Sequence, residues 1–205
     1  MTGLLIVGSA PCALEDLSKA QALYPFADIM LVNGACTLVE DADHMLAGHT
    51  AKAEEFVAAR RRAFPHAGRI FVHANWASRK RPPIAASFPS VTHWWEGDVS
   101  SGATSAGKAA LIGIKMGYWP IVLCGCPMDG SGYHPGEGTL TKDSSCQRIG
   151  DPKMQERRTI KRYREQMANL ARTAFLGKVF SMSGFTKKVL GAPPVPNQNN
   201  QEWLE

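Results

Sequence analysis

Short apolar runs alternate along the chain with longer segments whose apolar positions recur at a helical spacing. The short runs predict strands at Leu4–Val7, Asp28–Val32, Met45–Ala47, Arg69–His73, Val91–Trp95, Ile121–Cys124 and Lys178–Met182. The longer segments predict helices at Leu14–Leu23, Ala51–Phe64, Ser105–Met116, Pro152–Leu176 and Phe185–Leu190. Because strands that alternate with helices form parallel sheets covered on both faces, the pattern predicts an α/β fold with a mainly parallel, Rossmann-like sheet.

The length of 205 residues suits one such domain, which we expect to span residues 1–191. Residues 192–205 are rich in Pro, Asn and Gln and predict a loosely held tail. No apolar run approaches the ~20 residues of a membrane span, and the first residues enter a strand-like run where a signal peptide would have a basic leader. The five cysteines form an odd set without a CxxC spacing, which is typical of reduced thiols in a cytoplasmic protein.

The candidate site follows from the predicted sheet, because ligands of such folds bind outside the carboxyl ends of the strands. After the first strand, Gly8 allows a sharp turn, and the small residues Ser9 and Ala10 allow a ligand to approach the main chain. The next helix would then offer its free N–H groups to an anion. The same residues also fit an ordinary strand-to-helix turn, and the loop lacks the GxGxxG pattern.

Polar and glycine-rich residues follow other strands as well, at Asn33-Gly34, Gly48-His49 and Gly125–Asp129. A further turn, Ser100-Ser101-Gly102, precedes a predicted helix and is rich in hydroxyl and amide groups. The segment Gly102–Ala109 resembles a P-loop, but Ala109 occupies the position where a P-loop requires Ser or Thr for Mg²⁺. We therefore interpret it as a helix start rather than a P-loop.

Three histidines, His49, His73 and His134, are predicted at strand ends or loops on this edge of the sheet, where they could donate or accept protons near neutral pH. Each alone also fits an ordinary loop histidine. The others are predicted to be solvated (His44 and His66) or to serve packing (His93). No metal-binding motif such as HExxH is present, so no dedicated metal site is expected, with the pair Asp129 and His134 left open.

The net charge of +5 and the pI of about 9.0 suit a protein that handles phosphate, and support nucleic-acid binding only weakly. The basic stretch Arg157–Arg164 lies on a predicted helix. It fits either a solvated face or a surface for an acidic acceptor.

Short motifs in a fixed order suggest relatives. They are Ile6–Leu14, Leu31–Gly34, Gly48-His49, Ser100–Ala103, Gly117-Tyr118, Ile121–Asp129, Ser181–Thr186 and Leu190-Gly191. Through Ile6–Leu14, Leu31–Gly34 and the stretch from Ser100 to Asp129, the chain resembles the small bacterial sialyltransferases and the archaeal hydroxymethylpterin pyrophosphokinase-like family. Around Gly48-His49, in Leu123–Asp129 and in Ser181–Gly191 it resembles a set of phage proteins more closely. The chain departs from the family pattern at Ser9 and Cys12 of the first loop, and at Cys126-Pro127 near the last motif.

The resemblance implies a nucleotide-binding transferase, namely a glycosyltransferase that uses a nucleotide-activated sugar and requires no metal cofactor. It implies that the amides of Gly8, Ser9 and Ala10 hold phosphate, and that Asn33 with Gly34 binds ribose or phosphate. The remaining implied roles are contact with nucleotide or sugar (Ser100, Ser101 and Gly102), a pocket wall (Gly125 and Asp129) and acid or base catalysis (His134 or His49).

Two other functions remain open at this stage. An ATP- and Mg²⁺-dependent pyrophosphokinase-like transferase would need carboxylates, for which Asp98, Asp129 and Asp143 are the loop candidates. A non-catalytic nucleotide-binding module would bind its ligand without turnover. Under every one of these hypotheses the expected partner is a small nucleotide or nucleotide sugar, with the acceptor unspecified and no membrane contact.

Overall fold

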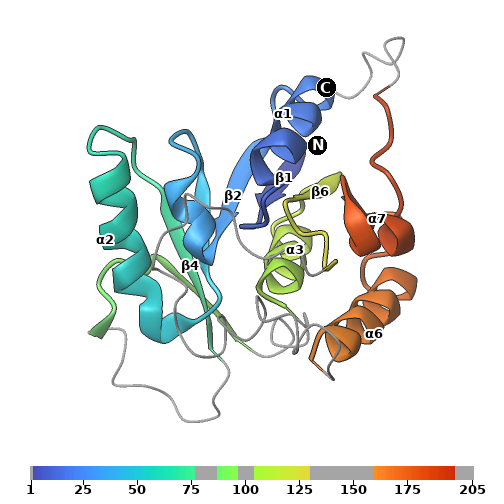
Figure 1. The fold of residues 1–205 in the computed structure, drawn as a ribbon. Coiled ribbons are helices and arrows are strands. Elements are labelled where there is room, and N and C mark those ends of the chain that lie inside the picture. The colour runs from blue at the N-terminus through green and yellow to red at the C-terminus, as the bar shows by residue number, and fades with distance from the viewer. Residues whose placement is uncertain (1, 77–86, 97–103, 130–158, 197–205) are drawn as a thin grey trace.

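The computed structural model describes residues 2–76, 87–96, 104–129 and 159–196 (Figure 1). These residues form one parallel sheet of seven strands in the order β5-β4-β3-β2-β1-β6-β7. The strands are β1 (Leu4–Val7), β2 (Asp28–Val32), β3 (His44–Ala47), β4 (Phe71–Trp76), β5 (His93–Glu96), β6 (Ile121–Cys124) and β7 (Val179–Ser181). The predicted α/β fold with a parallel sheet is therefore confirmed.

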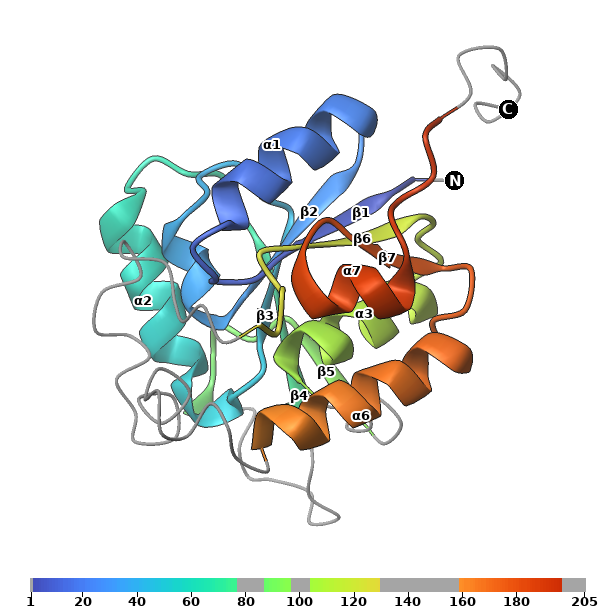
Figure 2. The ribbon, with the colours of Figure 1, turned by 45° about the vertical axis from the view of Figure 1, so that its right-hand side comes forward.

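Helices cover both faces of the sheet (Figure 2). The described helices are α1 (Ala13–Leu23), α2 (Ala53–Ala63), α3 (Ser105–Lys115), α6 (Thr159–Arg172) and α7 (Gly184–Leu190), with short 3-10 turns at Asn33–Thr37 and Thr50–Lys52. Helices α1 and α2 pack on one face of the sheet, and α3 and α6 pack on the other.

Strand β1 lies near the middle of the sheet and is fully buried. Its side chains alternate between the two cores, since Leu5 and Val7 face α1 while Leu4 and Ile6 face α3. Burial on both faces explains why the sequence of this strand is continuously apolar rather than alternating.

The chain reverses its direction across the sheet once. From β1 it adds β2, β3, β4 and β5 toward one edge, and it then crosses back to place β6 on the other side of β1. The carboxyl ends of β1 and β6 therefore flank the topological switch point, where doubly wound sheets form a crevice.

The observed bounds of β3 and β4 differ from the predicted ones in a way that changes where His44 and His73 lie. Strand β3 begins at His44, one residue before the predicted run, so His44 belongs to the sheet and is only 6% exposed. The prediction of a solvated His44 was wrong. Strand β4 extends to Trp76, so His73 lies inside the strand rather than at its end.

Gly191, the last residue of the predicted domain, and the first residues of the predicted tail pack against the rest of the domain. The Gly191 carbonyl accepts the Ser181 amide at 3.0 Å, Pro193 is buried, and the Tyr24 hydroxyl donates to the Pro194 carbonyl. Residues 197–205 lie outside the described part. None of the described helices is both long and apolar enough to span a bilayer. Of the five cysteines, the four within the described ranges are free thiols, and Cys146 lies outside them.

Candidate functional site

The carboxyl ends of β2 and β3 are joined by a side chain. Asn33 directly follows β2 and adopts a left-handed backbone conformation with φ of 52°. Its Oδ1 atom accepts the amide of Gly48, the residue after β3, at 2.8 Å. Asn is among the few residues that tolerate this conformation, so the sequence Asn33-Gly34 fixes the geometry of this edge.

Helix α3 begins directly against these residues. A Cβ atom on Gly48 would collide with the Ser105 side chain and would approach Asn33 Oδ1 to 3.2 Å. The Thr104 hydroxyl caps the helix by accepting the Gly107 amide at 3.1 Å, and the first turn carries no acidic residue. The first turn of α3 therefore offers its positive end and its Ser105 and Ala106 amides, which have no partner within the helix, to this edge of the sheet.

The loop after β1 is arranged differently. The Gly8 amide donates to the Cys124 carbonyl at 2.8 Å, and the Ala10 amide donates to the Gly125 carbonyl at 3.2 Å. Two of the three amides that we expected to hold phosphate are therefore engaged within the protein, and only that of Ser9 lacks such a bond among the described contacts. Gly8 is required for this close approach, because a Cβ there would lie 2.5 Å from Gly125 O.

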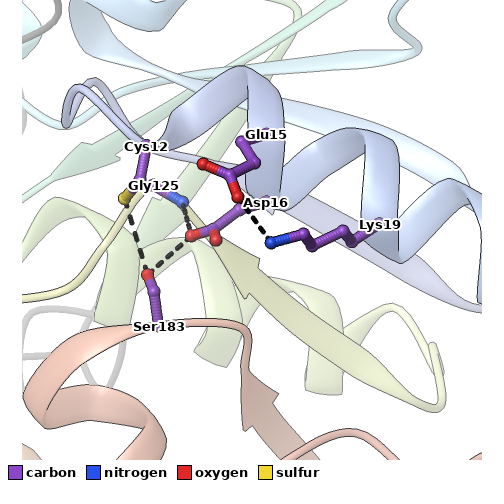
Figure 3. A network of polar contacts seen from close by, with 6 residues as sticks. All are labelled: Cys12, Glu15, Asp16, Lys19, Gly125 and Ser183. Carbon is purple, nitrogen blue, oxygen red and sulfur yellow. Dashed lines mark hydrogen bonds and ion pairs between the residues drawn. The ribbon is translucent and has the colours of Figure 1, made fainter.

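A buried carboxylate closes the switch point between β1 and β6 (Figure 3). Asp16, in the first turn of α1 and only 5% exposed, accepts the Gly125 amide at 2.9 Å and the Ser183 hydroxyl at 2.6 Å. Because Ser183 gives its proton to Asp16, the Cys12 thiol donates to Ser183 Oγ at 3.5 Å. Burial raises the pKa of Cys12, so this thiol stays protonated and serves as a donor rather than a nucleophile.

We name Cys12, Asp16, Gly125 and Ser183 the Asp16 clasp. It joins the start of α1, the end of β6 and the start of α7, three segments that are far apart in the sequence. The carboxylate also occupies the positive end of α1. The clasp therefore disfavours an anion at the start of α1, whereas the first turn of α3, Ser105–Lys108, contains no acidic residue among the residues that the structure describes.

The segment after β6 is held tightly. Gly125 has φ of 63°, Met128 has φ of 51°, and the Met128 carbonyl accepts Nε of Arg164 from α6 at 2.8 Å. Asp129 is exposed at the end of this segment. Gly34 is buried in the turn after β2, where its carbonyl accepts the Thr37 hydroxyl at 3.1 Å, so it supports Asn33 rather than facing solvent.

His49 is exposed immediately after Gly48 and thus lies at the edge formed by Asn33 and Ser105. His134, Ser100, Ser101 and Gly102 lie outside the described residues, as do Asp98 and Asp143. The structure thus brings together Asn33, Gly48, His49 and the start of α3. Sequence reasoning missed Ser105 and Asp16, although the small residue at position 48 and the acid near a helix start were signals for them.

A buried polar network connects four strands on the face that α3 covers. Trp95 Nε1 donates to His73 Nδ1 at 3.0 Å, and His73 Nε2 lies 3.1 Å from His44 Nδ1. His44 Nε2 lies 3.0 Å from the Tyr118 hydroxyl, which donates to the Asp28 carboxylate. Because the Trp95 indole can only donate, His73 Nδ1 must be unprotonated and accept its N–H. His73 Nε2 then carries a proton and donates to His44 Nδ1, and His44 Nε2 in turn donates to the Tyr118 hydroxyl.

All members of this network are satisfied when both histidines are neutral and Asp28 is ionised. Burial lowers the pKa of His73 to about 3 and also lowers that of His44. The expectation that His73 lies on the working edge was therefore wrong, because its ring is buried inside the sheet and committed to this network. No signal in the single sequence pairs these residues, because the contacts depend on the register of β3, β4 and β5.

Within the described ranges, no group of three or more His, Cys, Asp or Glu side chains is placed to hold a metal ion. Comparisons with protein-family models, with curated proteins and with solved structures found no match to this chain.

Proposed function

We propose that this chain binds a nucleotide across the carboxyl ends of β1–β3, with phosphate at the start of α3. One observation carries the proposal: the first turn of α3, free of acidic residues, lies against Gly48 and Asn33 at the end of parallel strands. Amides and the positive end of a helix at such a position favour phosphate. The clasp at α1 favours this site over the first loop, because Asp16 already occupies the corresponding helix end.

The reaction class that we propose is transfer of a sugar from a nucleotide-activated donor to a hydroxyl acceptor. The resemblance of the sequence motifs to sialyltransferases supports this class. His49 is exposed next to Gly48, where it would act as a base toward the acceptor hydroxyl or as an acid toward the leaving phosphate. The amides of α3 would stabilise the negative charge that develops on the departing phosphate.

Asn33→Asp tests the site. The carboxylate keeps an acceptor for the Gly48 amide and tolerates the left-handed backbone, so the protein should fold. It also adds a negative charge beside the proposed phosphate, which should weaken nucleotide binding by about tenfold or more. Asn169→Asp, on the exposed face of α6, makes the same chemical change elsewhere and is the matched control.

The measurement is a thermal-shift screen of nucleotides and nucleotide sugars, followed by calorimetry on the best ligand. A ligand that binds only the folded state raises the melting temperature by mass action. We expect at least one nucleotide to stabilise the wild-type protein and the Asn169→Asp variant but not Asn33→Asp. Equal stabilisation of all three proteins, or none of the wild type by any nucleotide, would contradict the proposal.

His49→Ala then separates transfer from simple binding. With the identified donor, we expect turnover to fall by ~10²-fold while nucleotide affinity stays nearly unchanged, because the imidazole acts mainly in the transition state. The exposed His66 provides a matched control, and His66→Ala should leave both quantities unchanged. Binding without any product from the wild-type protein would instead indicate a non-catalytic nucleotide-binding module.

A further inference from the structure

The positive charge of the chain is concentrated in its last described segment. Residues 159–196 contain seven Lys and Arg residues and a single acid, Glu165, which gives a net charge of +6. Because the whole chain carries +5, the remainder has a net charge of −1. A charge separation of this size between parts of one chain is typical of proteins that bind polyanions.

Helix α6 presents part of this charge on one face. Its buried side, with Met167, Leu170 and Ala171, packs against the core. Lys161, Arg162 and Arg172 are exposed on the other side of the helix. Residues 161 and 172 are separated by three helical turns, so they lie on the same face about 16 Å apart along the axis.

The neighbouring helix α7 extends the charged surface. Helices α6 and α7 contact each other and lie side by side in Figure 2. Lys187 and Lys188 are exposed on α7, and Lys178 is exposed just before β7. We call Lys161, Arg162, Arg172, Lys178, Lys187 and Lys188 the α6–α7 basic surface.

Within the described residues the ion pairs are Lys19 with Glu15 and His44 with Asp28, so none of the six cations is in a direct ion pair there. One carboxylate, that of exposed Glu165, lies on the same face of α6 as Lys161. Arg164 differs from them because it is half-buried and contacts other segments, whereas Arg172 donates its Nε to the Ala168 carbonyl of its own helix at 3.2 Å and stays exposed. The Nε of Arg164 donates to Met128 O, and its guanidinium lies 5.1 Å from the centre of the Phe185 ring. The structure therefore distinguishes one structural arginine from six exposed cations.

The chemistry of the surface favours a dissolved polyanion over a membrane. A helix that lies on a bilayer inserts its apolar face, but that face of α6 already packs in the core. Among the described residues of this segment, the exposed large apolar side chains are Leu176 and Val195, and neither lies on α6 or α7. The ~16 Å length of the α6 face corresponds to about five nucleotides of one strand at 3.4 Å each along a duplex.

We propose that the α6–α7 basic surface binds nucleic acid through its phosphate backbone, independently of the nucleotide site proposed above. Lys and Arg side chains at this spacing neutralise successive phosphates and release counterions, so binding should be insensitive to base sequence and sensitive to salt. If about four phosphates are neutralised, affinity should fall about a hundredfold between 50 mM and 200 mM salt.

Fluorescence anisotropy with labelled single-stranded and duplex DNA tests the proposal on the full chain. The double variant Lys161→Glu, Arg162→Glu should weaken binding at least tenfold and flatten the salt dependence. Arg61→Glu, Arg62→Glu on α2 is the matched control, because it reverses an equally exposed basic pair and changes the net charge equally. The control should change affinity less than twofold. A milder change on α7, the double variant Lys187→Gln, Lys188→Gln, should weaken binding severalfold. Melting curves show whether each variant is folded.

Three results would overturn the proposal: no DNA binding by the wild-type protein at 50 mM salt, equal losses in the α6 and α2 variants, or absence of a salt effect. Vesicles of anionic phospholipid and polyglutamate serve as competing polyanions. Binding of either with the same dependence on Lys161 and Arg162, and without binding of DNA, would assign the surface to a membrane or an acidic protein and would also overturn the proposal.

Discussion

The Asp16 carboxylate accepts the Gly125 amide at 2.9 Å and so joins the first turn of α1 to the residue at which β6 ends. These two residues are 109 positions apart, and their contact closes the switch point at which a nucleotide would be expected from topology alone. The Ser183 hydroxyl completes the closure from the third segment. The ligand site that we propose therefore lies nearer β2 and β3, beside the first turn of α3, which itself contains no acidic residue.

Removal of the Asp16 side chain should destabilise the protein. Asp16→Ala leaves the buried Gly125 amide and the Ser183 hydroxyl without their acceptor, which should reduce the free energy of unfolding by about 3 kcal/mol. Glu15→Ala is the adjacent control, because Glu15 is exposed and pairs with Lys19 at the surface, so its loss should change the free energy of unfolding much less. Urea unfolding measures both, and similar losses in the two variants would contradict the structural role of the clasp.

The histidine network predicts a loss of stability in mild acid. The pKa of His73 is about 3 in the folded protein against 6.5 for an ordinary histidine, so the unfolded chain binds a proton that the folded chain rejects. This contribution is complete above pH 6.5 and is lost progressively as the pH falls toward 3. His73 alone should cost about 2 kcal/mol between pH 6.5 and pH 5.

His73→Gln checks the origin of this pH dependence, because glutamine can still donate toward His44 but does not titrate. The quantity to compare is the slope of unfolding free energy against pH, which should decrease in His73→Gln even if the variant is less stable at every pH. His66→Gln, a change at an exposed histidine, should leave the slope as in the wild type. An unchanged slope in His73→Gln would show that other groups cause the acid sensitivity.

Gly8 should tolerate no side chain. A Cβ at this position would lie 2.5 Å from both Cys126 Sγ and Gly125 O, and the latter is backbone that cannot move without breaking the contact between β1 and β6. Gly8→Val should therefore unfold the protein or lower its melting temperature sharply, rather than affect nucleotide binding alone. Gly68→Ala, where nothing lies within 4 Å, should have little effect. A stably folded Gly8→Val protein would contradict this packing.

Lys108 should contribute little to nucleotide binding. It is the fourth residue of α3, and burial lowers the pKa of its amine. Lys108→Ala should reduce triphosphate affinity less than about tenfold, or ~1.4 kcal/mol, as measured by calorimetry. A thousandfold loss would instead show that the segment works as a P-loop despite Ala109.

The strands that could be predicted best are those buried on both faces. Leu4–Val7, Asp28–Val32 and Ile121–Cys124 match the structure at both ends, because each run is followed by a turn-forming residue (Gly8, Asn33 or Gly125) that interrupts the apolar pattern. Strands nearer the sheet edge were less well defined. The predicted third strand began at Met45, because histidine is a polar residue and did not count toward the apolar run. In the structure His44 belongs to β3 and its ring is buried.

The candidate site was predictable only in part, for a related reason. The residues after each strand, such as Asn33 and Gly48, were identified because topology alone places them at one edge. Contacts across the fold were not, since Ser105 meets Gly48 and Asp16 meets Gly125 through tertiary packing that no local pattern encodes. The first loop shows the converse, because its small residues were expected to let a ligand approach the main chain, whereas the group that approaches Gly8 and Ala10 is the backbone at the end of β6.

Backbone NMR of the isotope-labelled protein tests the central claim most directly, by titration with the nucleotide that gives the largest thermal shift. We expect the largest amide shifts at Ser105 and Ala106, with smaller ones at Gly34 and Gly48. The amides of Gly8 and Ala10, which already donate within the protein, should change little. Shifts centred on Gly8, Ser9 and Ala10, with none in α3, would place the phosphate at α1 and would contradict the proposed site at the start of α3.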